Sequence, residues 1–295
     1  MPSISARLIL LCFPLLAGCS IADISQSSSV ESDQSEQIAT RLLDEVIQTQ
    51  GFSVLAAQNL YTFEVTDHWP GFMGKLARLW PEPETDLLVQ YNFNTFDGRA
   101  CFRSGSREGD VIGVQSWAYY EQVAGDSLAR NRDTGEEANS LEFGLVVLHY
   151  FLELPYRLRR APIRRYYGER TLRGQTYDLV FATWKQEAPT PDFDQYILWI
   201  NRETHLVDYC LYTLRDNKNP LTRQKYGSIA YLDYVDAGGF LRPSRMPVML
   251  DDGIIKAKSL EDYFHQFTLH SFSYGGFDEA TLYPLENLPK QIDTK

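Results

Sequence analysis

The hydrophobic and polar positions divide the chain into a short apolar start, a polar link, an amphipathic helix and a long series of strands. Ile38, Leu42 and Val46 recur at helical spacing, which predicts a helix that begins near residue 36 and stops at Gly51. After about residue 59 the apolar positions alternate, as in half-buried strands. The strand-like segments cover residues 61–65, 87–96, 99–103, 111–120, 164–170, 177–184, 196–201, 206–215, 223–235, 240–250 and 263–274.

Short turns between these segments predict an antiparallel sheet. The turns at 201–204, 236–239 and 251–253 leave no room for a crossover, so neighbouring strands must run antiparallel. Segments 196–201 and 206–210 are apolar on both faces, which indicates strands that are covered on both sides. The fold class is therefore predicted to be α+β, with a curved antiparallel sheet and helices on its concave face.

One further segment, residues 139–154, is predicted to be a long apolar helix. Asn139 and Glu142 form a capping-box pattern, and Pro155 is expected to end the helix. Apolar residues occupy nearly every side of this helix, which predicts burial on most sides.

The first residues are typical of an export signal. Arg7 precedes an apolar run over residues 8–16, which is too short to span a bilayer. The run Leu16-Ala17-Gly18-Cys19 resembles the lipobox of bacterial lipoproteins. That resemblance implies cleavage before Cys19 and lipid attachment to it, and an ordinary signal peptide with a chance cysteine is the alternative. Because Ser20 rather than aspartate follows, the resemblance also implies the outer membrane, facing the periplasm.

These segments predict a simple domain organisation. A signal peptide over residues 1–18 is followed by a lipidated flexible tether over residues 19–35. A single domain over residues 36–280 and a C-terminal tail over residues 281–295 complete the chain.

Composition narrows the possible partners. The formal net charge of −11 argues against general nucleic-acid binding, which needs lysine and arginine to neutralise phosphates. The 44% hydrophobic content is ample for a core. Once Cys12 leaves with the signal and Cys19 carries lipid, Cys101 and Cys210 remain in an oxidising compartment as a candidate disulfide. Two separately buried thiols are the alternative.

A family resemblance appears in the second half of the chain. The segment from Tyr196 to Tyr209 is a strand, a turn reading Asn-Arg-Glu-Thr and a strand; the segments Tyr231-Leu-Asp-Tyr234 and Gly239-Phe-Leu-Arg-Pro243 follow it. Together they resemble the C-terminal half of LolA/LolB-like lipoprotein carriers, over roughly residues 175–250. The resemblance implies a half-open β-barrel whose interior binds acyl chains, although this chain is considerably longer than LolB.

In such a barrel the helix over residues 139–154 would cover the concave face. Both a mobile lid, which a lipid displaces, and a permanent core helix fit its pattern. The candidate residues for contact with a hydrophobic ligand are Leu141, Phe143, Leu145, Leu148, Phe151 and Leu152.

Two further segments could contact a membrane or a partner, one rich in arginine and one apolar. Seven arginines fall between residues 157 and 173, and they would either contact lipid headgroups or an anionic partner, or pair with the protein's own carboxylates. The candidates for anionic contact are Arg157, Arg159, Arg160, Arg164 and Arg165. The segment 72–80, with Lys75 and Arg78, resembles a membrane-interface segment, and a plain surface helix is the alternative.

Nothing in the sequence points to catalysis. The five histidines are scattered, and no nucleophile-elbow, zinc-protease, P-loop or dinucleotide motif is present. We therefore expect no catalytic residue, cofactor or metal. The predicted function is a membrane-anchored lipoprotein that binds a lipid, acyl chain or lipoprotein; the alternative is an assembly lipoprotein that binds an envelope protein.

Overall fold

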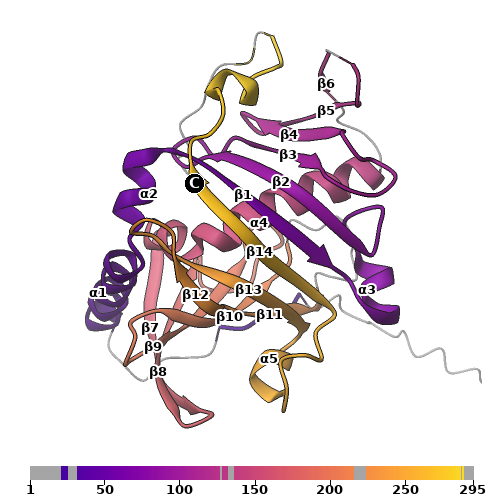
Figure 1. Cartoon of the computed structure of the whole chain (residues 1–295). Coiled ribbons are helices and arrows are strands. Elements are labelled where there is room, and N and C mark those ends of the chain that lie inside the picture. The colour runs from indigo at the N-terminus through magenta and orange to yellow at the C-terminus, as the bar shows by residue number, and fades with distance from the viewer. Residues whose placement is uncertain are drawn as a thin grey trace, which may run out of the picture.

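The structure is a computed structural model that describes residues 21–25, 32–126, 128–131, 136–215, 224–286 and 288. Its main feature is one sheet of 14 strands, all paired antiparallel. Figure 1 shows this sheet curving around helix α4. The predicted α+β class and the curved antiparallel sheet are confirmed.

Two runs of strands are joined through the first and last strands. The first run contains β1 (Leu60–His68), β2 (Glu84–Asn92), β3 (Gly98–Phe102), β4 (Val111–Gln115), β5 (Ala118–Gln122) and β6 (Arg130–Asn131). The second contains β7 (Ile163–Leu172), β8 (Gln175–Thr183), β9 (Gln195–Asn201), β10 (Val207–Thr213), β11 (Tyr226–Ala230), β12 (Leu232–Asp236), β13 (Leu241–Leu250) and β14 (His265–Tyr274).

The strand order is β6-β5-β4-β3-β2-β1-β14-β13-β11-β10-β9-β8-β7, and β12 pairs only with β13. No pairing among the described residues joins β6 to β7, so the sheet is an open half-barrel.

Five helices and a 3₁₀ turn accompany the sheet in the described part of the chain. They are α1 (Ser32–Gln50), α2 (Phe52–Gln58), α3 (Gly71–Ala77), α4 (Glu136–Arg159) and α5 (Gly253–Lys256), with the 3₁₀ turn at η2 (Glu279–Leu282). None of the helices within the described ranges is both long and apolar enough to cross a bilayer.

Apolar side chains cover both faces of the second run of strands, as the sequence predicts. Because side chains alternate along a strand, Leu198 of β9 packs in the main core on the concave face, and Trp199 packs in a second cluster on the convex face. Ile24, near the start of the described chain, and Ile254, on α5, also belong to this second cluster and help to cover the convex face of the sheet.

The residues after the predicted anchor are fixed on the convex face. Ile24 is 7% exposed. Its N–H donates to Gln195 Oε1 (3.0 Å), and its carbonyl accepts from the Tyr167 hydroxyl (2.9 Å). The prediction of a flexible tether over residues 19–35 is therefore wrong for 21–25, which the apolar outer face holds in place. It is also wrong for 32–35, which belong to α1.

The domain also continues beyond the boundary predicted at residue 280. Leu282 is fully buried, and the Leu285 N–H and carbonyl both bond to the Gln115 amide, at 2.9 and 3.1 Å. Residues 281–285 therefore pack on the sheet as part of the domain. The predicted signal peptide and Cys19 lie outside the described residues.

Candidate ligand-binding site on the concave face

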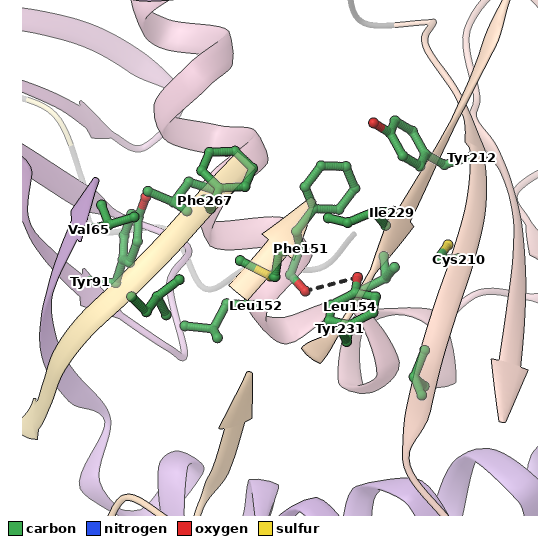
Figure 2. Close-up of a cluster of buried hydrophobic side chains, with 14 of the residues drawn as sticks. Val65, Tyr91, Phe151, Leu152, Leu154, Cys210, Tyr212, Ile229, Tyr231 and Phe267 are labelled. Atoms are coloured by element: carbon green, nitrogen blue, oxygen red, sulfur yellow. Dashed lines mark hydrogen bonds between the residues drawn. The ribbon is translucent and has the colours of Figure 1, made fainter. Parts of the chain in front are cut away.

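Helix α4 fills the concave face of the half-barrel. Figure 2 shows Phe151, Leu152 and Leu154 among side chains from both runs of strands, including Val65 and Ile229. Of the predicted ligand-contact residues, Phe143 is half-buried and packs against the same core, and five are at most 4% exposed: Leu141, Leu145, Leu148, Phe151 and Leu152. The predicted burial of this helix is confirmed. These side chains fill the concave face of the half-barrel.

Pro155 lies inside α4 and does not end it, contrary to the sequence prediction. A proline has no N–H to donate to the carbonyl four residues earlier, which leaves the Phe151 carbonyl without its helical partner. The Tyr231 hydroxyl donates to that carbonyl at 3.3 Å (Figure 2). The sheet thus supplies the hydrogen bond that the proline removes, and the helix runs on to Arg159.

Two more tyrosines from the sheet bond to α4. The Tyr91 hydroxyl donates to the Leu145 carbonyl (2.6 Å), and the Tyr61 hydroxyl donates to Glu153 Oε1 (2.6 Å). Burial is the main cause that raises the pKa of Tyr61, Tyr91 and Tyr231 well above the usual value. All three hydroxyls therefore keep their protons and act as donors at any physiological pH.

Three buried side chains, His149, Glu153 and Arg157, follow one another at intervals of one helical turn along α4 and contact each other. His149 Nε2 is 2.8 Å from Glu153 Oε1, and Arg157 Nε donates to Glu153 Oε2 at 2.8 Å. The three side chains are at most 1% exposed. Burial alone would raise the pKa of Glu153, but Arg157, His149 and Tyr61 together lower it. The carboxylate is therefore charged, and its counter-charge lies on the same helix.

The aromatic rings around this cluster stabilise it further. The His149 imidazole stacks between Tyr91 and Phe96, with ring centroids 3.8 and 4.3 Å apart. The Arg157 guanidinium lies 4.7 Å from the Phe96 ring centroid and donates to the Phe93 carbonyl at 3.0 Å. His149 is thus a buried core residue that is hydrogen-bonded to Glu153.

The Glu153–Arg157 ion pair lies within α4, so withdrawing the helix would leave that pair intact. Withdrawal would break the three tyrosine hydrogen bonds, the Arg157–Phe93 bond and the ion pair between Arg159 and Asp44 of α1. The contacts of α4 with the main core are apolar.

The arginine cluster does not form an open cationic patch. Arg157 is buried against Glu153, Arg159 Nε pairs with Asp44 (2.6 Å), and Arg164 and Arg165 pair with Glu36 and Glu187 at 3.2 Å each. Four of the five candidates for anionic contact thus meet the protein's own carboxylates. Arg160 is exposed. The geometry favours the internal-pairing alternative over headgroup contact.

The candidate disulfide is absent. Cys101 on β3 and Cys210 on β10 are both free thiols. Six strand steps separate β3 from β10 in the sheet order, or about 29 Å along the sheet at roughly 4.8 Å per step. A disulfide needs Cα atoms within about 7 Å of each other. The alternative of two separate thiols holds, with Cys210 buried and Cys101 half-buried.

We expect the two thiols to differ sharply in reactivity. Cys210 is fully buried, and burial raises the pKa of its thiol, so very little reactive thiolate forms. Iodoacetamide should modify Cys101 in the native protein and Cys210 only in urea, as peptide mass spectrometry would detect. Equal modification of both cysteines in the native protein would contradict the structure.

The buried cluster on α4 is the site feature that the sequence analysis missed. Its only signal in the sequence is the spacing of His149, Glu153 and Arg157, each four residues apart on an otherwise apolar helix. The tyrosine partners carry no local signal, because they come from β1, β2 and the residue between β11 and β12. Within the described residues, no group of three or more His, Cys, Asp and Glu side chains could hold a metal ion.

Comparison with known proteins identifies the fold. No family model matches the chain, and no curated protein matches it. Among solved structures it is similar to a LolA superfamily protein from Nitrosomonas europaea, with a TM-score of 0.50 and 10% identity, over 83% of this chain and 96% of that one.

Two further structures agree. A putative outer membrane lipoprotein-sorting protein domain from Vibrio parahaemolyticus gives a TM-score of 0.51 at 6% identity, over 86% of this chain and 97% of that one. A DUF1329 family protein from Desulfovibrio piger gives 0.51 at 12% identity, over 84% and 96%. The chain therefore has the LolA-like fold that the resemblance in segment 175–250 predicted.

Proposed function

We propose that this LolA-like chain is a non-catalytic lipoprotein of the bacterial envelope that binds a lipid, an acyl chain or a lipoprotein on its concave face. The observation that carries the proposal is α4, an apolar helix that fills the concave face and pairs its buried Glu153 with Arg157 and His149 of the same helix. Such a helix can be displaced by an acyl chain at little net cost, because one buried apolar surface replaces another.

The lipobox supports a location at the membrane for this binding. A cysteine with two or more acyl chains anchors a protein stably, whereas a single chain gives only marginal binding. A lipid on Cys19 would thus hold the half-barrel at the membrane, and Ser20 favours the outer membrane with the domain in the periplasm.

A protein ligand is the competing function. The edge strands β6 and β7 have no partner strand on one side among the described residues, and an envelope protein would bind there by adding a strand. In that case α4 would stay in place, so the behaviour of α4 separates the two functions.

The test is lipid uptake by the chain from Ser20 onward, produced without the export signal. Native mass spectrometry should find co-purified lipid, and a fluorescent fatty acid should bind with displacement of α4. Tyr61→Phe removes a hydrogen bond to a charged acceptor on α4, so uptake should rise by roughly ten- to a hundredfold, since such bonds contribute roughly 1.5–3 kcal/mol.

Tyr234→Phe is the matched control for this variant. Its hydroxyl donates to the Val207 carbonyl (2.7 Å), so the substitution removes a tyrosine hydrogen bond that does not involve α4. Its uptake should equal that of the unmodified chain. If neither the unmodified chain nor Tyr61→Phe takes up fatty acid, or if both variants raise uptake equally, the lipid-binding proposal is wrong.

A further inference from the structure

Several strands begin or end together on one rim of the sheet, which we call the α3 rim. The end of β1 pairs with the start of β14, which pairs with the end of β13. The end of β13 pairs with the start of β11, and the start of β11 pairs with the end of β10. The end of β10 in turn pairs with the start of β9. Helix α3 follows β1 directly and therefore lies on this rim (Figure 1).

The chain that leads to the predicted anchor reaches the same rim. Gln195, the first residue of β9, donates to Asp23 Oδ1 at 3.1 Å and accepts from the Ile24 N–H. Arg215, just beyond the end of β10, donates to the Ala22 carbonyl. Cys19 precedes Ile21 by two residues, which span at most about 7 Å. A lipid on Cys19 would therefore enter the bilayer beside the α3 rim.

Helix α3 carries the two most exposed large apolar side chains of the described residues. Phe72 is 74% exposed, Leu76 67% and Met73 47%. Nine large apolar side chains are exposed in the described part of the chain, and three of them lie in these seven residues. Contiguous exposed apolar residues mark contact with a partner or a membrane.

The base of α3 is closely packed although its outer surface is exposed. Gly74 is the one buried residue of the helix, and a Cβ there would lie 2.5 Å from the Trp69 backbone. Trp69 stacks on His265 with ring centroids 3.7 Å apart, and the Trp80 indole N–H donates to Asp67. The apolar side chains are thus held outward before any partner binds, which lowers the entropic cost of binding.

The charges next to α3 suit a phospholipid surface. Lys75 and Arg78 form no ion pair with a described residue, although the protein as a whole has a net charge of −11. Long basic side chains beside an apolar surface place their stems along acyl chains and their charges among headgroups. About five strand steps, or roughly 24 Å, separate α3 from Gln195, so the anchor and α3 would contact one patch of bilayer.

We propose that the α3 rim rests on the bilayer, with Phe72, Met73 and Leu76 inserted at the level of the headgroups as a second membrane contact beside the Cys19 lipid. The proposal rests on the lipid anchor of the proposed function. It fixes the orientation of the half-barrel, because two separated contacts prevent rotation about a single anchor.

The experiment uses the full lipidated chain added to vesicles of phosphatidylethanolamine and phosphatidylglycerol. A Cys101→Ser background leaves only the buried Cys210 thiol, so an environment-sensitive NBD label can be attached at Leu76→Cys. The matched control carries the label at Val235→Cys, a 45% exposed position on β12 near the opposite ends of the strands. We expect a blue shift and roughly tenfold slower reduction by dithionite at position 76 only, because that label would lie within the interface. Adding Phe72→Ser should abolish most of this protection.

Each other outcome has a defined meaning. If the chain binds vesicles and the label at position 76 stays as accessible as the label at 235, the α3 contact is wrong while the lipid anchor stands. If protection appears only when the protein is crowded on the vesicles, a second copy of the chain covers α3 and the membrane contact is again wrong. If the chain does not bind vesicles and carries no acyl groups, the anchor itself is wrong.

Discussion

Replacing Glu153 with leucine should destabilise the fold by about 3–5 kcal/mol, the range measured when one member of a buried ion pair is removed. In Glu153→Leu the Arg157 guanidinium would stay buried without its counter-charge, and His149 would lose its hydrogen-bond partner. The free energy of unfolding from urea titration, followed by circular dichroism, would measure the effect.

Two further variants separate this cause from a general packing defect. Glu153→Leu combined with Arg157→Met removes both charges and should recover much of the lost stability, since apolar replacements of a buried pair are often neutral. Asp44→Leu removes the half-exposed partner of Arg159 and should cost no more than about 1 kcal/mol. A Glu153→Leu protein as stable as the unmodified one would show that the buried cluster contributes little.

The same carboxylate should make the protein sensitive to acid. Its folded-state pKa is lowered from the ordinary value of 4.5, so its ionisation stabilises the fold fully at pH values above 4.5. That contribution should be lost as the pH falls below this value and through the lower folded pKa. Glu153→Leu should lack this part of the pH dependence, and an unchanged acid profile would argue against the charged state of Glu153.

Replacing Cys19 with serine should move the protein from the membrane fraction to the soluble periplasmic fraction. Without the thiol no diacylglyceryl group can be attached, and anchoring of this kind needs two or more acyl chains. Incorporation of labelled palmitate and ultracentrifugation of cell extracts would measure the change.

Cys12→Ser is the matched control for this substitution. Cys12 lies in the apolar run of the predicted signal peptide and would be removed with it, so the variant should keep both palmitate and membrane attachment. Palmitate on the Cys19→Ser protein would refute the lipobox assignment. Membrane attachment without palmitate would instead point to contacts such as the α3 rim.

Much of the fold could be predicted because its signals are local. Alternating apolar residues and short turns are enough to place antiparallel strands, and the wide apolar surface of segment 139–154 predicts a buried helix without reference to its neighbours. The two-sided apolar pattern of residues 196–201 likewise predicts a strand covered on both faces, and both coverings are present.

The failures involve partners that lie far apart in the sequence. Pro155 is a local stop signal, but it is overruled by Tyr231, which lies 80 residues away from the carbonyl it bonds. Residues 21–25 belong to a segment, 20–35, that is rich in serine, glutamine and aspartate as a tether is, yet Gln195, more than 170 residues later, holds Ile24 on the sheet.

The sequence by itself determined the antiparallel sheet and the buried central helix, and it alone carries the lipobox prediction at Cys19, because each depends on the periodicity or order of nearby residues. Only the tertiary structure decided that α4 continues past Pro155, that Tyr61 bonds to Glu153, and that Cys101 and Cys210 lie on separate strands far apart in the sheet. It also placed α3 on the rim where Ala22, Asp23 and Ile24 are held. These features depend on which strands become neighbours, and strand order arises from long-range packing that no local pattern encodes.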